Sequence, residues 1–171
     1  SSDWSRCVVM RPGDGYTGLR ELLDSGRLLE AKDLWVAGAV GEDELPGVKR
    51  FNEKMISKSL EAIEELKDVV MGFEIPKYHI VRTQYAAAGE EVRERFRRVF
   101  LDSVDFVVCD SSTGVDVMER VKVKPTRQCV LFIKEQLRCA ATLVKEHIGV
   151  LYDRVSKLDN VMVQGLAGRS T

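Results

Sequence analysis

The residues best suited to chemistry lie near the carboxyl end of this sequence, where residues 164–169 read QGLAGR. Gln164 and Arg169 carry side chains that recognise amide-bearing or charged ligands, and the forked donors of an arginine suit phosphate oxygens. Gly165 and Gly168 allow the backbone to approach a ligand or a neighbouring domain closely. Taken alone, the segment is equally compatible with a solvated surface loop, so its meaning depends on the elements that position it.

The second half of the sequence predicts alternating strands and helices. Apolar runs read as strands at residues 78–83, 105–110, 129–133 and 147–152. The spacing of Val92, Phe96 and Phe100 predicts a helix over residues 89–101. The run 129–133 is apolar throughout, which is typical of a middle strand covered on both faces. We therefore predict an α/β fold, with an open, mainly parallel sheet and helices on both faces.

Polar residues directly follow each predicted strand. They are Arg82-Thr83-Gln84, Asp110-Ser111-Ser112, Lys134-Glu135-Gln136 and Tyr152-Asp153-Arg154. In open parallel sheets, ligands bind beyond the carboxyl ends of the strands. The distribution therefore indicates a binding edge, although strands also end in polar residues for structural reasons alone.

Residues 1–75 carry scaffold features rather than a site. Apolar residues at three- and four-residue steps predict a long amphipathic helix over residues 48–70. A short apolar strand is predicted at residues 6–10. The loop 11–15 superficially resembles a phosphate cradle, but it lacks the lysine and hydroxyl residue of such loops, so we interpret it as a turn.

Composition sets limits on the class of protein. The 171 residues are 44% hydrophobic with a net charge of -1, enough for one compact domain with a helical appendage. Without a global basic field, any nucleic-acid contact must come from a local patch. No apolar run reaches membrane-spanning length and no signal peptide is recognisable, so we expect a cytoplasmic protein that is not secreted. The cysteines lack zinc-site spacing and predict reduced, buried thiols: Cys7, Cys109, Cys129 and Cys139.

Three segments resemble motifs of the second, C-terminal RecA-like domain of superfamily 2 helicases, most closely the phage and large-DNA-virus type. They are FIKEQLRCAATL at residues 132–143, HIGVLYDR at 147–154 and VQGLAGR at 163–169. The resemblance covers residues 76–171 and makes 132–142 the fifth helicase motif and 164–169 the sixth. Residues 1–75 match no family that we recognise, and we interpret them as the tail of a preceding domain or an insertion. We expect the chain to be a fragment of a larger protein.

The resemblance implies an ATP site shared between two domains. ATP and Mg²⁺ would be bound mainly by an N-terminal RecA-like domain of the same protein, while this domain supplies Arg169 as an arginine finger. Gly168 would lie beside the nucleotide, and Gln164 would orient it or couple the cleft to nucleic acid. The sequence departs from the usual Q-x-x-G-R pattern by one extra residue before Gly168. It carries no Walker A lysine loop, and we assign no DExx box because the acidic run 42–44 reads as a turn, so we expect no hydrolysis by this chain alone.

The resemblance also implies a track for DNA or RNA, held mainly through phosphates. The candidate residues follow the third and first strands of the domain: Lys134, Gln136, Arg138 and Thr142, then Arg82 and Thr83. The arginine-rich segment 93–98 is a further candidate. Its glutamate neighbours equally predict a solvated helix face.

Two other readings stay open. One is a stand-alone α/β module that binds nucleotide or nucleic acid without motor activity. The other is a different enzyme on a doubly wound sheet, with its site at Asp110-Ser111-Ser112 and Lys134-Glu135. Fold alone does not separate these readings from a motor domain.

Overall fold

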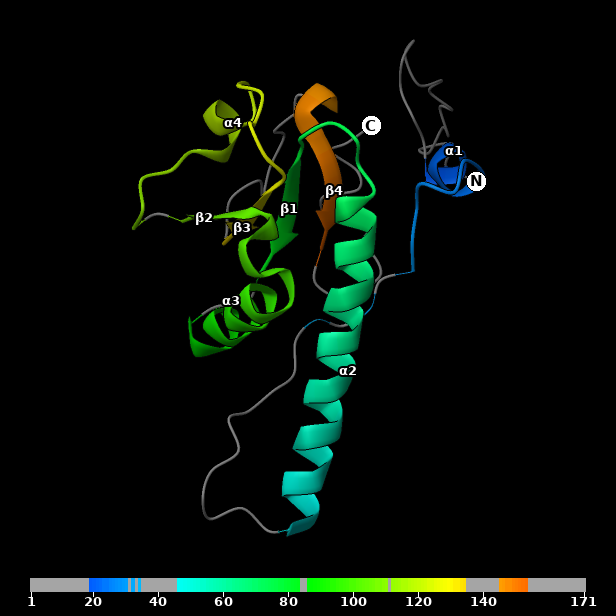
Figure 1. Cartoon of the computed structure of the whole chain (residues 1–171), viewed down its shortest axis with the longest axis vertical. Helices are drawn as coiled ribbons and strands as arrows, with labels where there is room; N and C mark the ends of the chain where they lie inside the picture. The colour runs from blue at the N-terminus through cyan, green and yellow to red at the C-terminus, as the bar shows by residue number, and fades with distance from the viewer. Residues whose placement is uncertain are drawn as a thin grey trace, which may run out of the picture.

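The computed structural model describes residues 19–30, 32, 34, 46–83, 86–110, 112–134 and 145–153. Figure 1 shows the arrangement of its helices and strands. In chain order they are α1 (Leu19–Asp24), α2 (Pro46–Met71), β1 (Tyr78–Arg82), α3 (Ala86–Phe100), the 3₁₀ turn η1 (Leu101–Ser103), β2 (Asp105–Cys109), α4 (Val117–Arg120), β3 (Cys129–Ile133), the 3₁₀ turn η2 (Lys145–His147) and β4 (Ile148–Tyr152).

The strands form a four-stranded sheet in the order β2-β3-β1-β4, and every neighbouring pair is parallel. This arrangement confirms the predicted open parallel sheet. All five residues of β3 are buried, and β3 lies between β2 and β1. The prediction of a middle strand from its uninterrupted apolar run is therefore also confirmed.

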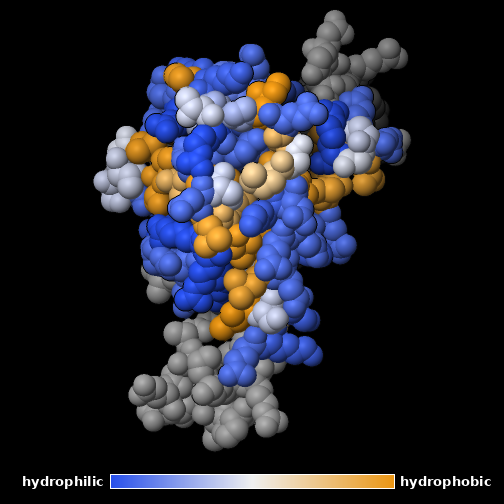
Figure 2. All heavy atoms as spheres, in the orientation of Figure 1, coloured by the Kyte–Doolittle hydropathy of each residue, from blue (hydrophilic) through white to orange (hydrophobic). Residues whose placement is uncertain are grey.

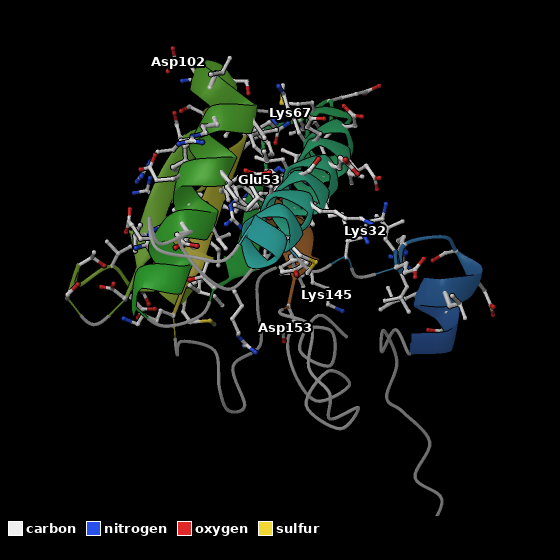
Figure 3. The ribbon with its side chains drawn as sticks, turned by 90° about the horizontal axis from the view of Figure 1, so that it is seen from below. Lys32, Glu53, Lys67, Asp102, Lys145 and Asp153 are labelled. Atoms are coloured by element: carbon white, nitrogen blue, oxygen red, sulfur yellow. The ribbon has the colours of Figure 1, made fainter. Side chains whose placement is uncertain are left out.

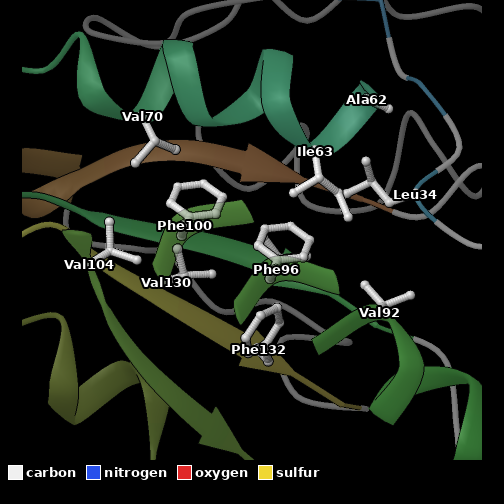
Figure 4. Packing of buried hydrophobic residues seen from close by; sticks show 11 residues of the cluster. Leu34, Ala62, Ile63, Val70, Val92, Phe96, Phe100, Val104, Val130 and Phe132 are labelled. Carbon is white, nitrogen blue, oxygen red and sulfur yellow. The ribbon is translucent and has the colours of Figure 1, made fainter. Parts of the chain in front are cut away.

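Helices cover both faces of the sheet, as predicted. On one face, α2 and α3 pack against alternate strand residues (Figure 4), and the buried cluster there is Leu34, Ala62, Ile63, Val70, Val81, Val92, Phe96, Phe100, Val104, Val130 and Phe132. On the other face, α4 and the residue after it cover a second cluster, made of Tyr78, Ile80, Cys109, Val117, Val121, Cys129, Leu131 and Ile133. The two clusters divide the odd and even positions of β1 and β3 between them, as the period of a strand requires.

Helix α2 is long because its buried residues recur at helical spacing. It begins at Pro46, whose missing N–H costs nothing at a first helical position. Ser59, Ala62, Ile63 and Val70 are buried along one face. The domain boundary predicted at residue 76 falls between α2 and β1 and stays a prediction, but α2 shares its hydrophobic core with the sheet.

A short segment before α2 is anchored to the same core. Leu34 is 3% exposed, and its carbonyl accepts a hydrogen bond of 2.8 Å from the hydroxyl of Ser59. The Tyr152 hydroxyl at the end of β4 accepts from the Leu34 N–H at 3.2 Å and donates to the Lys32 carbonyl at 2.8 Å. The end of β4 is thus tied to α2 through this segment.

Strand β4 bulges where it passes His79 of β1. The register moves from Tyr78 opposite Ile148 to Ile80 opposite Leu151, so β4 has one extra residue there. The Val150 N–H donates to His79 Nδ1 at 3.2 Å, and His79 Nε2 lies 3.0 Å from Gln128 Oε1. Because Nδ1 accepts, Nε2 carries the proton of a neutral ring, and burial lowers the pKa of His79 in agreement.

Most of the surface visible in Figure 2 is hydrophilic, and a band of apolar side chains crosses it. Exposed apolar residues include Val69 and Met71 on α2 and Ile75 in the turn that follows. Charged and polar side chains are therefore the groups available for recognising a ligand over most of this face.

Candidate binding site at the carboxyl edge of the sheet

The carboxyl ends of β3, β1 and β2 bring residues from distant parts of the sequence together. The Thr83 N–H, just after β1, donates to the Ile133 carbonyl at 3.1 Å. The Lys134 N–H, just after β3, donates to the Cys109 carbonyl at 3.3 Å. Lys134 therefore lies between the ends of β1 and β2, with Thr83 on one side and Asp110 on the other.

The strand order also places the ends of β1 and β3 where successive connections lead toward opposite edges of the sheet. The connection that follows β1 runs through α3 to β2, which lies beyond β3 in the sheet. The connection that follows β3 leads the other way, to β4, which lies beyond β1. His147 Nδ1 lies 2.9 Å from the Val121 carbonyl, so the second connection ends on the α4 face, opposite α3. In open α/β sheets, ligands bind beyond the carboxyl ends of adjacent strands whose connections lead in opposite directions.

Arg82 and Asp153 form an ion pair across this edge. One guanidinium nitrogen, Nη1, lies 2.9 Å and 3.2 Å from the two Asp153 carboxylate oxygens. The Arg82 side chain is 15% exposed and the Asp153 side chain 14%. The pair joins the ends of β1 and β4, and Figure 3 shows Asp153 beyond the end of β4. Reduced exposure to water makes such a pair less screened by salt than a surface pair.

Thr83 carries the most informative polar atom of the edge. Its side chain is 7% exposed, and its Oγ1 has no hydrogen-bond partner among the residues that the structure describes. A buried hydroxyl without a partner costs about 1–3 kcal/mol. Unsatisfied groups of this kind mark sites where a ligand or water completes the hydrogen bonding.

Asp110 organises the loop after β2. Its Oδ1 accepts from the Ser112 N–H at 2.9 Å, the Ser112 hydroxyl at 2.6 Å and the Thr113 N–H at 2.9 Å. The Ser112 hydroxyl bond, the Thr113 N–H and the charge of Lys134 hold the pKa of Asp110 below its usual value. Asp110 is thus an ionised carboxylate near Lys134, used mainly to shape its own loop.

The charged groups that end the strands cancel in pairs. Arg82 and Lys134 are cations, Asp110 and Asp153 are carboxylates, and each cation has one carboxylate nearby. Basic side chains at the ends of two adjacent strands suit an oxyanion such as a phosphate group. The chemistry offered is recognition and positioning of an anion.

Three of the residues predicted to bind nucleic acid are brought together by the fold: Arg82, Thr83 and Lys134. Asp153 was predicted only as one polar residue at the edge, and its pairing with Arg82 was missed. The remaining predicted site residues lie outside the described part of the chain: Gln136, Arg138, Thr142, Gln164, Gly168 and Arg169. The loop 11–15 and the strand predicted at 6–10 also lie outside it.

Three of the four arginines of helix α3 contact groups within the protein. Arg93 pairs with Glu90, and Arg97 pairs with Glu94. Arg95 is 7% exposed, and it lies 3.2 Å from the Ser59 hydroxyl of α2. These contacts favour the solvated, self-paired helix face over a nucleic-acid contact.

Two of the cysteines, Cys109 and Cys129, are described, and both are buried and reduced as predicted. Burial raises the pKa of each thiol to about 11. At neutral pH they are therefore protonated, and neither is suited to act as a nucleophile or metal ligand. Cys7 and Cys139 lie outside the described residues.

Comparison of the chain with protein-family models, curated proteins and solved structures finds no match. Within the described ranges, no group of three or more His, Cys, Asp or Glu residues could hold a metal ion. Among the helices that are described, none combines the length and apolar character required to cross a membrane.

Replacing Thr83 by valine should raise the free energy of unfolding by about 1 kcal/mol, because it removes a buried hydroxyl for which the described residues supply no hydrogen-bond partner. Thr113→Val is the matched control. The Thr113 hydroxyl has two acceptors within hydrogen-bond distance, the Val108 and Asp110 carbonyl oxygens at 3.0 Å and 3.1 Å. It also accepts a hydrogen bond from the Asp110 N–H at 3.1 Å. That control should lose about 1 kcal/mol. Urea unfolding followed by circular dichroism measures both, and a destabilised Thr83→Val would show that the hydroxyl has a partner.

Proposed function

We propose that this chain is the second RecA-like motor domain of an ATP-dependent nucleic-acid helicase or translocase. One observation carries the proposal: Arg82, Thr83 and Lys134, singled out in the sequence as phosphate-binding residues, lie at one edge of a parallel sheet, where successive connections lead in opposite directions. The motif resemblance over residues 132–169 supports a motor domain over another anion-binding module.

Phosphate recognition at this edge has a simple physical basis. Lys134 presents an ammonium group and Arg82 a guanidinium at the ends of two adjacent strands. A single nucleic-acid strand passing the edge would place successive phosphates within reach of these groups, which neutralise charge without reading sequence. Thr83 would add a neutral donor that fixes one phosphate oxygen.

ATP hydrolysis would need groups outside the described residues. Arg169 would reach across the interdomain cleft to the γ-phosphate, with Gly168 beside it, and Gln164 would couple the cleft to the nucleic acid. A partner RecA-like domain of the same protein would hold ATP and Mg²⁺ through its phosphate loop and carboxylates. This domain would supply positive charge at the transferred phosphoryl group, and nucleotide binding would supply the free energy for domain closure.

Nucleic-acid binding is tested by replacing Lys134 with alanine. Because one phosphate contact is removed, binding to a fluorescent oligothymidylate should weaken roughly fivefold at about 0.1 M salt, and the salt slope should fall by about 0.7. Fluorescence anisotropy across a salt series measures both quantities, with an oligouridylate run in parallel to compare DNA with RNA.

Lys122→Ala is the control for the loss of one positive charge. Lys122 lies after α4, away from the carboxyl edge, and pairs with Glu119. Its replacement should leave the slope unchanged. Equal effects of the two variants would contradict a phosphate site at Lys134, and strand binding without stimulated ATP hydrolysis in the larger protein would favour the stand-alone binding module.

A further inference from the structure

The Arg82–Asp153 pair places a carboxylate where a phosphate contact is expected. Asp153 offers both of its oxygens to one guanidinium nitrogen, at 2.9 Å and 3.2 Å. A phosphate group would approach the same nitrogen with two oxygens of similar geometry. Both ligands cannot use this face of Arg82 together, because two anions held at one cation repel each other.

We propose that Asp153 is a built-in competitor that occupies Arg82 until a nucleic-acid phosphate displaces it, so that this carboxylate sets the affinity of the carboxyl edge for a strand. The inference rests on the proposed nucleic-acid function of the same edge. It adds a gating residue that the sequence did not indicate, because the two partners are separated by 71 positions.

The balance of charge at the carboxyl edge supports this competition between Asp153 and phosphate for Arg82. Arg82 and Lys134 are matched by Asp153 and Asp110, so the edge as described has no excess positive charge. Asp110 is committed to its loop through three hydrogen bonds from Ser112 and Thr113. Displacement of Asp153 is the step that would make the Arg82 cation available to a phosphate.

Release of Asp153 does not require the end of β4 to move. Tyr152, the preceding residue, pairs with Val81 in the sheet, and its hydroxyl is held by the backbone of Lys32 and Leu34. These contacts fix the backbone at Asp153 independently of its side chain. A rotation of the Asp153 side chain would then separate the two charges while β4 keeps its place in the sheet.

The test is Asp153→Asn, which keeps the shape of the side chain and removes its charge. With the complete 171-residue chain and fluorescent oligothymidylate, binding should tighten roughly fivefold at about 0.1 M salt. The salt slope should steepen by about 0.7, because Arg82 gains a phosphate contact. Asp153→Glu keeps the charge and should show the slope of the unmodified protein.

Asp105→Asn is a matched control. Asp105 pairs with Arg127 at 3.1 Å, and it begins β2 at the opposite edge of the sheet. Its replacement changes the net charge equally and should leave the slope unchanged. In an Arg82→Gln background, Asp153→Asn should have no further effect on affinity.

The outcomes separate the two proposals. If the unmodified chain binds neither oligothymidylate nor oligouridylate in a salt-dependent way, the nucleic-acid function itself is wrong. If it binds but the salt slope of Asp153→Asn equals that of the unmodified protein or of Asp105→Asn, then the Arg82–Asp153 pair has only a structural role. That result refutes the proposed competition between Asp153 and phosphate. Thermal unfolding of each variant is measured alongside, and a folded Asp153→Asn with weaker binding also refutes this competition.

Discussion

Replacing Gly149 by alanine should lower the free energy of unfolding by about 3 kcal/mol, because the added methyl group would overpack against His79 and strain its hydrogen bonds. A Cβ at Gly149 would lie 2.7 Å from His79 Cε1 and 2.9 Å from Nδ1, well inside van der Waals contact. It would also lie 3.2 Å from the Cβ of Lys77. Urea unfolding followed by circular dichroism measures the loss.

The imidazole has little freedom to move away from the new methyl group. His79 is 1% exposed, and its two nitrogens are held by the Val150 N–H and by Oε1 of the Gln128 side chain. Its ring also packs edge-on against Phe73, with centroids 5.3 Å apart. Gln128 is fixed in turn because its amide donates to the Phe73 carbonyl at 2.8 Å. Movement of the ring would therefore break a network that joins β1, β4 and the turn after α2.

Two comparisons isolate the clash. Gly72→Ala adds the same methyl group at a position where the nearest atoms, the Asp68 and Val69 carbonyl oxygens, are 3.4 Å away, and it should change stability by less than about 0.5 kcal/mol. In a His79→Ala background, Gly149→Ala should cost less than about 1 kcal/mol, because the obstructing ring is gone. An equal cost with and without the ring would show that His79 is not the obstacle.

The elements of the sheet were predictable wherever the apolar pattern was long or unbroken. β3 has the predicted bounds, Cys129–Ile133, because five consecutive apolar residues end abruptly at Gln128 and Lys134. Helix α4 was missed, since it has only four residues and its burial rests on Val117 and the following Val121. A single turn of helix gives too few repeats for periodicity to detect.

The order of the strands was not predictable from the sequence, and the site depends on that order. Arg82, Lys134 and Asp153 each follow an apolar run, so their place at a common edge could be inferred. Which of them are neighbours follows from β1 lying between β3 and β4, a long-range arrangement for which local patterns carry no signal. The same holds for His79, which reads in the sequence only as one residue of a strand.

Replacing Arg169 by alanine should lower nucleic-acid-stimulated ATP hydrolysis by about 10³-fold, in a protein that carries this chain together with the proposed first motor domain. The guanidinium would stabilise charge that develops on the transferred phosphoryl group, and this interaction is made mainly in the transition state. ATP binding should therefore change by no more than a few-fold. Steady-state turnover and nucleotide binding are measured on the same preparation.

Arg97→Ala is a matched control, because its guanidinium pairs with Glu94 on the exposed face of α3. Turnover of that variant should stay within about twofold of the unmodified protein, as is typical for loss of an exposed ion pair. Normal turnover in Arg169→Ala would remove this residue from the finger role. Absence of stimulated turnover in the unmodified protein would contradict the motor function itself.

Arg169→Lys then decides whether the residue acts through charge alone or through geometry. A lysine keeps the positive charge but presents a single ammonium group, whereas arginine presents parallel donors that can engage two phosphate oxygens at once. If the finger binds the phosphoryl group in that forked manner, lysine should restore only a small part of the activity lost in Arg169→Ala. Substantial rescue by lysine would instead mean that a point charge in the cleft is sufficient. The glycines around Arg169 would then matter for close approach of the two domains rather than for the orientation of the guanidinium.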